Sequence, residues 1–219
     1  MMNYEQIKQD SAVKTYIAQA DASLGALGYT EHSFAHVGRV AATTAYILET
    51  LGYSERTVEL GKIAGYLHDI GNLVNRVDHS QSGALMAFRM LDKWEFPAEE
   101  TSLIVTAIGN HDEGTGVPVN PIAAALILAD KSDVRRSRVR TKDMAVFDIH
   151  DRVNYSVTSS ELTIDEAHTV VKLRLTVDTQ FSTVLDYFAI FTNRMLLCRQ
   201  AAQALGLQFK LIINDQQLG

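Results

Sequence analysis

The sequence predicts a mainly α-helical protein whose last third forms a small mixed α and β appendage. Apolar residues recur every three or four positions through the first part of the chain, a spacing that places them on one face of a helix. Beyond about residue 145, several segments alternate apolar and polar residues, which is typical of strands. A chain of 219 residues can bury one core and carry a small appended subdomain. We therefore expect a helical domain over residues 1–145 and an α+β appendage over residues 146–219.

The composition is that of a soluble globular protein, because 47% of the residues are hydrophobic and 21% are charged. A net charge of -6 argues against a broad surface for nucleic acid, although a metal could still attract small phosphorylated ligands. Cys198 is the only cysteine, which excludes an intrachain disulfide and a thiolate zinc cluster. The N-terminal residues lack a signal-peptide pattern, and no apolar run approaches the roughly 20 residues that span a bilayer. We therefore expect a cytoplasmic protein.

The first part of the chain predicts a helix or a pair of helices over residues 3–28, ended by Gly28. The next helix covers residues 33–51, and Ser33 is a favoured N-cap for it. His36 lies in the first turns of this helix and shares a face with apolar residues. We expect its side chain to point into the protein.

A third helical segment begins at Ser54 and leads into the adjacent pair His68 and Asp69. Gly71 follows two positions later, and glycine commonly ends a helix. An imidazole beside a carboxylate at a helix end offers a divalent metal two ligands of different hardness. A carboxylate can also bridge two ions, which an imidazole cannot do.

Three more helices are expected before the appendage. One covers residues 79–94 and starts with a histidine. The second starts at Pro97, a residue suited to the first turn of a helix, and ends at Asn110-His111-Asp112. The third starts at Pro121 and is so apolar that we expect it to be central. Asp130 near its end is then a charge on a buried element, and such charges are normally paired or bound to metal.

The appendage predicts the order β-β-α-β. Alternating apolar residues over 153–157, 162–164 and 171–177 indicate two or three antiparallel strands. A helix over residues 182–205 and a last strand over residues 208–213 follow. The appendage can close over a site in the helical domain, or the edge of its last strand can pair with a second copy in a homodimer.

Candidate metal ligands lie at or near the ends of successive helices, and they are His36, His68, Asp69, His79, His111 and Asp130. Any one of these histidines alone is more often a hydrogen-bonded structural residue, and Asp130 alone could pair with Arg39 or Lys131. Together, four imidazoles and two carboxylates in this arrangement are hard to explain by packing. The histidines expected outside the site are His32, His150 and His168.

The order and context of the six residues resemble the HD superfamily of metal-dependent phosphohydrolases. The matching segments are His36-Val-Gly-Arg39-Val, Leu67-His-Asp-Ile-Gly71, His79-Ser-Gln-Ser-Gly-Ala84, Ile108-Gly-Asn-His111 and Leu128-Ala-Asp130-Lys131. The resemblance covers residues 30–140 and implies a helical bundle that holds metal through the six side chains. Because members with the two additional histidines commonly bind two ions, it implies a dinuclear site bridged by Asp69. The mixed ligands suit divalent or trivalent iron, manganese or another first-row ion.

The reaction that the resemblance implies is hydrolysis of a phosphoester or phosphoanhydride in a small, nucleotide-like substrate. Two neighbouring cations can lower the pKa of a bridging water and neutralise charge on a phosphoryl oxygen. Asp69 then has a catalytic role, and Arg39 and Lys131 are the expected contacts to phosphate. Asp112 could serve as an acid or an outer ligand, whereas the arginines at 135–136 are expected at the surface.

Several narrower assignments differ in how well they match the sequence. The six-residue layout resembles bacterial diadenosine tetraphosphate hydrolases. The loop Glu113-Gly-Thr-Gly-Val-Pro118 only partly matches the signature of cyclic-di-GMP phosphodiesterases, and Asn110-His111 replaces their double histidine. Stringent-response hydrolases place two acids soon after the His-Asp pair, where this chain has residues 72–74, Asn-Leu-Val. A different class of function is a sensory module that binds metal and nucleotide without turnover.

Overall fold

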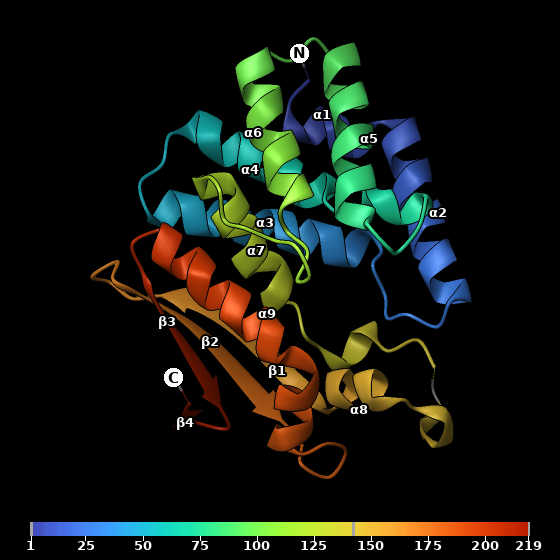
Figure 1. Cartoon of the computed structure of the whole chain (residues 1–219), viewed down its shortest axis with the longest axis vertical. Helices are drawn as coiled ribbons and strands as arrows, with labels where there is room; N and C mark the ends of the chain where they lie inside the picture. Colours follow the sequence, from blue (N-terminus) through green and yellow to red (C-terminus); the bar gives the residue numbers. More distant parts are fainter. Residues whose placement is uncertain (1, 142, 219) are drawn as a thin grey trace.

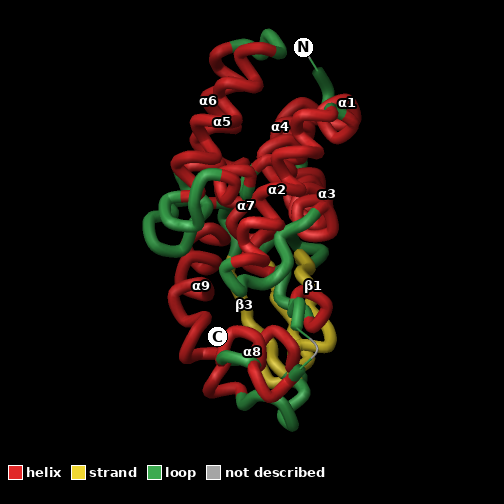
Figure 2. Tube along the Cα trace, turned by 90° about the vertical axis from the view of Figure 1, so that its right-hand side faces the viewer, coloured by secondary structure: helices red, strands yellow, loops and turns green. Residues whose placement is uncertain are grey.

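The fold is that of a computed structural model, which describes residues 2–141 and 143–218. Helices α1 to α7 form the upper part of the molecule in Figure 1, and a sheet with α8 and α9 forms the lower part. Figure 2 shows from the side that the strands occupy only this lower part. The predicted fold class, mainly helical with a small C-terminal α+β part, is confirmed.

The first four helices begin where the sequence predicts. Their bounds are Tyr4–Gln9 for α1, Ser11–Ala26 for α2, Phe34–Thr50 for α3 and Glu55–Leu67 for α4. Each start is capped by a side-chain oxygen that accepts hydrogen bonds from free backbone N–H groups. The capping residues are Asn3, Asp10, Ser33 and Ser54.

The end of α4 differs from the prediction. The helix stops at Leu67, and the chain continues into the short 3-10 helix η1 (Ile70–Leu73). Gly71 does not end the helix. Its lack of a side chain lets the backbone of η1 approach that of His79, since a Cβ atom at position 71 would lie 1.9 Å from the carbonyl oxygen of His79. Helix η1 therefore packs directly against the first turn of α5 (His79–Lys93). This contact brings the end of α4 and the start of α5 together.

Helix α7 (Pro121–Ser132) is central, as its apolar sequence predicts. Every residue from 122 to 129 is buried. The helix starts with Pro121 at its first position, and the Asn120 side chain accepts a hydrogen bond from the backbone of Ala123. Helix α6 (Ala98–Gly109) packs beside α5 at the top of Figure 1.

The predicted first strand of the appendage is partly wrong. Residues 149–156 form helix α8 (Ile149–Ser156), and its start is capped by Asp148. Val153 and Val157 are four residues apart, so they share one face of a helix as readily as one face of a strand. The strand begins only at Val157. Three alternating apolar residues are too few to distinguish the spacing of a strand from that of a helix.

The rest of the appendage follows the predicted order. Its elements are β1 (Val157–Ile164), β2 (Val170–Val177), α9 (Val184–Ala204), β3 (Gln208–Ile213) and β4 (Gln216–Gln217). The sheet order is β1-β2-β3-β4; β2 and β3 run parallel, and the other pairs run antiparallel. The sequence predicts that the strand over residues 208–213 has a free edge. In the structure this strand, β3, lies between β2 and β4. Strand β1 lies at one edge of the sheet, where it contacts α3 and α7. A homodimer through a strand edge remains a prediction.

Helix α9 connects the two parts of the molecule. It packs against α7 and crosses one face of the sheet (Figure 1). Buried side chains of the sheet, such as Leu173, belong to the same hydrophobic core as Leu126 of α7. The domain boundary at residue 145 remains a prediction. Within the described ranges, every helix is too short or too polar to span a bilayer.

Candidate metal centre

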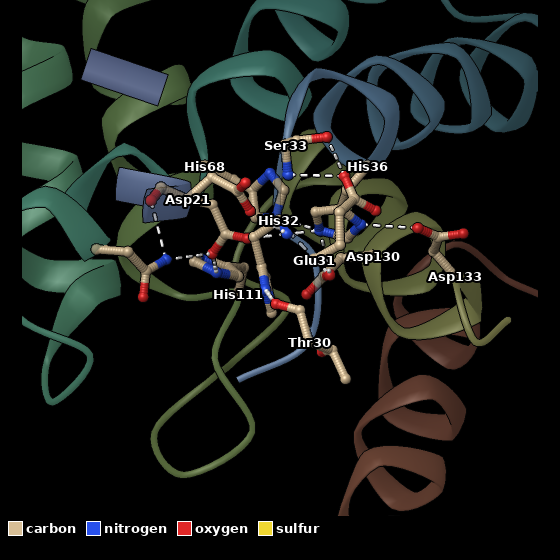
Figure 3. Close-up of polar contacts among 12 residues, drawn as sticks. Asp21, Thr30, Glu31, His32, Ser33, His36, His68, His111, Asp130 and Asp133 are labelled. Carbon is tan, nitrogen blue, oxygen red and sulfur yellow. Dashed lines mark hydrogen bonds and ion pairs between the residues drawn. The ribbon is translucent and has the colours of Figure 1, made fainter. Parts of the chain in front are cut away.

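The six expected ligands meet in the interior, although they come from separate elements. His36 lies in the first turn of α3, His68 and Asp69 directly follow α4, and His79 is the first residue of α5. His111 follows α6, and Asp130 lies near the end of α7. Figure 3 shows His36, His68, His111 and Asp130 gathered from these elements around one region. Their convergence follows from α3, α4 and α6 all packing around α7.

The first group of facing atoms comprises His36, His68, Asp69 and Asp130. The Nε2 atoms of His36 and His68 are 3.3 Å apart. Oδ2 of Asp69 lies 3.4 Å from Nε2 of His36 and 3.3 Å from Nε2 of His68. Oδ1 of Asp130 lies 3.4 Å from Nε2 of His36. Two imidazole nitrogens and two carboxylate oxygens thus point at one small volume.

The second group comprises His79, His111 and the other oxygen of Asp69. The Nε2 atoms of the two histidines are 3.2 Å apart. Oδ1 of Asp69 lies 3.5 Å from Nε2 of His79 and 3.9 Å from Nε2 of His111. The two oxygens of Asp69 therefore face two different pairs of histidines.

These separations fit ligands that share an ion. First-row ions bind imidazole nitrogen at about 2.1 Å, which places neighbouring ligand atoms about 3.0 to 3.4 Å apart in octahedral or tetrahedral arrangements. The two nitrogen pairs, at 3.3 and 3.2 Å, lie in this interval. The residues present therefore fit a metal centre, and His36, His68 and Asp130 form one candidate ligand triad. A second triad consists of His68, Asp69 and His111.

Hydrogen bonds on the far side of each ring orient the four imidazoles. In three cases Nδ1 donates to the backbone carbonyl three residues earlier, in the pairs His68–Gly65 at 2.8 Å, His79–Arg76 at 3.0 Å and His111–Ile108 at 2.6 Å. A carbonyl only accepts, so Nδ1 carries the proton and the lone pair of Nε2 faces the centre. Metal-binding histidines typically have this arrangement.

The fourth imidazole, that of His36, is oriented by a residue the sequence did not single out. Its Nδ1 lies 2.8 Å from Oδ2 of Asp133, which is buried. Burial raises the pKa of the Asp133 carboxyl, but the hydrogen bond to His36 and the charge of Arg138 hold it below its usual range. Arg135, expected at the surface, also donates to Asp133 at 2.8 Å and is only 20% exposed. Asp133 therefore stays charged and holds His36 in place.

The centre concentrates negative charge. Burial raises the pKa values of the Asp69 and Asp130 carboxyls. Interactions with the neighbouring His68 and His36 rings at Asp69, and with the charge of Lys131 at Asp130, outweigh burial and hold both pKa values well below the usual range. Two buried carboxylates require compensating positive charge, which bound cations would supply.

Two of the histidines respond to this environment in opposite directions. Burial and the nearby Arg138 lower the pKa of His36, but hydrogen bonds to three surrounding aspartates raise it to about 9. This position therefore favours a cation, and a proton and a metal ion would compete for it. For His111, burial, and then the neighbouring His68 ring and the charge of Lys131, lower the pKa to about 3. Its ring is neutral at pH 7, as a ligand must be.

A cavity of about 500 Å³ opens onto the centre. Asp69 and Lys131 line it on the side of the helical region, and His32 lies on the loop before α3. His150 of α8 and Arg194 of α9 line the opposite wall. The appendage therefore forms part of the route by which a small molecule reaches the six residues.

The two basic residues expected to contact phosphate are placed differently. Lys131 is buried in the cavity wall, and its Nζ lies 2.7 Å from Oδ2 of Asp130. Arg39 is not part of the cavity: its side chain is 54% exposed, and its Nε lies 3.5 Å from Asp133. Arg39 thus sits behind the ring of His36 and has no contact with the space in front of the centre.

Asp112 lies where an outer ligand is expected. It lines the cavity, and its Oδ1 is 3.9 Å from Nε2 of His79. Burial raises the pKa of its carboxyl, but the influence of Lys131, and then of His79, is larger in total and lowers the pKa below its usual value. The side chain is therefore charged at neutral pH and can accept a hydrogen bond from a water or ligand.

Two histidines that the sequence placed outside the site lie beside it. The ring of His32 is 5.3 Å from that of His36, and its Nδ1 donates to the carbonyl of Thr30 at 2.7 Å. The feature of the sequence that points to a place for His32 near the site is its position four residues before His36. His150 reaches the cavity because its segment is helix α8 and not a strand. His168 lies in the turn after β1, away from the cavity, as expected.

Comparison with known proteins places the chain in a family. The family model described as HD domain matches residues 33–152. An uncharacterized protein of Methanocaldococcus jannaschii, MJ1020, is 26% identical over 185 residues, covering 74% of this chain and 71% of that protein. The crystal structure of a predicted HD superfamily hydrolase from an uncultured Thermotogales bacterium matches with a TM-score of 0.47 and 20% identity, over 61% of this chain and 75% of that one. The last similarity is too low to add to the assignment. Because the family model spans more than half of the sequence and includes all six residues of the centre, this chain belongs to the HD domain family.

Proposed function

We propose that the protein is a metal-dependent phosphohydrolase that cleaves a phosphoester or phosphoanhydride of a nucleotide-like substrate. Membership of the HD domain family supports a hydrolase. The observation that carries the proposal is the position of Asp69, whose two oxygens face two separate pairs of histidines. A carboxylate in this position is suited to bridge two ions.

The proposed ligands divide into two sets around Asp69. His36, His68 and Asp130 would hold one ion with Oδ2 of Asp69, and His79 and His111 would hold the other with Oδ1. Imidazole and carboxylate ligands suit iron, manganese or another first-row ion. When bound, such ions lower the pKa of a coordinated water and offset charge on a phosphoryl oxygen.

The protein's own residues would position the substrate. Lys131, whose ammonium group lies beside Asp130, can donate to a phosphoryl oxygen from the cavity wall. Asp112 can accept a hydrogen bond from a water on the side of His79. Charged contacts in a recessed cavity are stronger than those at an open surface.

Turnover and metal content measured together test this function. Protein purified without chelator should contain about two first-row ions per chain by elemental analysis, and it should hydrolyse members of a nucleotide panel with added Mn²⁺ or Fe²⁺. The panel includes nucleoside mono-, di- and triphosphates, dinucleoside polyphosphates and cyclic dinucleotides. Protein that binds both metal and nucleotide without turnover would be a sensory module and would refute the proposal.

A matched pair of variants controls for unrelated phosphatase activity in the preparation. His68→Ala removes a buried candidate ligand, whereas His168→Asn changes an exposed histidine in a turn. Asparagine suits position 168 because its φ is 53°, in the left-handed region. Activity and metal should be lost in the first variant and unchanged in the second. Equal activity in both would assign the turnover to a contaminant.

A further inference from the structure

Helix α9 supplies the cavity with a cationic side chain that the proposed chemistry does not use. Arg194 lies beyond the segment matched by the family model, and its side chain is only 19% exposed. Its guanidinium carbon lies 4.0 Å from the centre of the Phe191 ring, and its Nε donates to Oε1 of Glu113 at 2.7 Å. Stacking and one hydrogen bond therefore fix the group at the cavity wall.

Most of the donors on this guanidinium are available. An arginine has five N–H donors, of which Nε–H is used by Glu113. Within residues 2–141 and 143–218, the two terminal nitrogens of Arg194 have no protein acceptor, although the side chain is largely buried. No buried side-chain nitrogen among the described residues lacks a partner, so these two nitrogens reach the solvent-filled space of the cavity. A recessed guanidinium that presents free donors to a cavity is suited to an anionic ligand.

Glu113 lies between two cations in this cavity. Its Oε1 is 2.7 Å from Nε of Arg194 and 3.7 Å from Nζ of Lys131. Lys131 in turn contacts Oδ2 of Asp130 at 2.7 Å. A chain of alternating charges thus runs from the candidate metal centre to α9. The carboxylate oxygen occupies a position, between an ammonium and a guanidinium, that a phosphate oxygen would also favour.

We infer that Arg194 and Lys131 bind a second phosphate group of the substrate, next to the phosphate at the metal centre, in place of the Glu113 carboxylate. The substrate class is then a diphosphate or polyphosphate compound, such as a nucleoside diphosphate or triphosphate, and not a simple monoester. This inference rests on the proposed function, because the metal centre holds the first phosphate. It makes α9 a determinant of specificity.

Binding of two probes to manganese-loaded protein tests the inference. Imidodiphosphate, a non-hydrolysable analogue of pyrophosphate, carries two phosphate groups, and inorganic phosphate carries one. In calorimetric titrations, Arg194→Gln should weaken imidodiphosphate binding about tenfold to 100-fold, since hydrogen bonds to a charged group are lost. Phosphate binding should change less than about threefold. Arg199→Gln, at an exposed position on the same helix, is the matched control and should leave both unchanged.

Glu113→Gln separates a binding role for Arg194 from a structural one. Removing the competing carboxylate should tighten imidodiphosphate binding about threefold or more, because the cations no longer need to release an anion. If Arg194→Gln and Glu113→Gln weaken both probes equally, the pair is structural and the inference is overturned. Melting temperature and metal content of each variant show whether it folds and retains the centre.

Turnover measured on the same samples distinguishes this inference from the proposed function. Selective loss of imidodiphosphate binding in Arg194→Gln, with no turnover by any variant, would support the anion site and refute the hydrolase. Turnover by wild-type protein, with unchanged imidodiphosphate binding in Arg194→Gln, would refute the anion site and leave the hydrolase standing.

Discussion

The helical region and the C-terminal region contribute different kinds of residue to the same cavity. The six residues of the candidate metal centre all come from residues 36–130, where each histidine ring is fixed by a second hydrogen bond. Residues 149–213 contribute His150 and Arg194, which line the opposite wall and lie closer to solvent. This difference suggests that the first region determines the chemistry and the second determines what enters.

The two sets of side chains differ in how deeply they are buried. Residues 122–129 of helix α7 are all buried, so the backbone that carries Asp130 cannot move without disturbing the core. His150, in contrast, is exposed on the short helix α8. Substitutions in the first region should therefore change metal content, whereas those in the second should change substrate preference at constant metal content.

The largest effect is expected for Asp69→Ala. This change removes the one side chain that faces both pairs of histidines, so both ions should be held more weakly. Loss of charge stabilisation worth several kcal/mol corresponds to at least about a 1,000-fold decrease in kcat. Elemental analysis and initial rates measure both effects. Asp92→Asn, at an exposed position of α5, is the control. Retention of two ions by Asp69→Ala would contradict the bridging role.

A smaller effect on the same region is expected for Asp133→Asn. Asparagine retains the size of the side chain but removes the negative charge that orients His36. Loss of a partner behind a metal-binding histidine typically weakens metal affinity about tenfold to 100-fold. Titration with a competing chelator measures that affinity. Unchanged affinity, in a variant that folds as the wild type does, would show that the ring is held by packing alone.

Gly71→Ala tests whether close packing of η1 on α5 positions the centre. The added Cβ would lie 1.9 Å from the carbonyl oxygen of His79, so the two elements must separate. We expect a loss of about 1 to 3 kcal/mol in the free energy of unfolding, measured with denaturant, together with weaker metal binding. Gly38→Ala, where a Cβ meets nothing within 4 Å, should instead stabilise α3 by up to about 1 kcal/mol. A larger loss of stability in Gly38→Ala than in Gly71→Ala would contradict the packing argument.

The smallest effect is expected in the C-terminal region. His150→Ala removes an exposed side chain from the cavity wall, so stability and metal content should stay as in wild type. We expect KM for the preferred substrate to rise less than about tenfold, because one polar contact at the cavity rim contributes about 1 kcal/mol. Steady-state kinetics provide the measurement. A loss of metal in this variant would show that the two regions are not separable.

The sequence predicts the helical framework well because its signals are local. Ser33 and Ser54 start helices where capping side chains are favoured, and the apolar run after Pro121 forms the central helix. The six candidate ligands were also found from the sequence, since each stands at a helix end whose position is set by local residues. The structure adds that the six side chains lie together in space. It does not add their role.

The remaining residues of the site depend on contacts that are distant in sequence. Glu113 and Arg194 are 81 positions apart, and no local pattern predicts that they meet. Arg39 was expected in the site because it lies close to His36, but a shift of three residues turns a side chain roughly 60° around the helix. That turn is enough to place it behind the ring. Asp133 precedes a basic stretch in the sequence, and no local pattern identifies it as the partner of His36.

Anomalous scattering from crystals grown without chelator tests the central claim most directly. Data at the absorption edge of the metal found by elemental analysis should show two peaks, one beside each oxygen of Asp69. One peak should lie among His36, His68 and Asp130, and the other should lie beside His79 and His111. Crystals with metal supplied that show these side chains pointing apart, with no ion between them, would contradict the account.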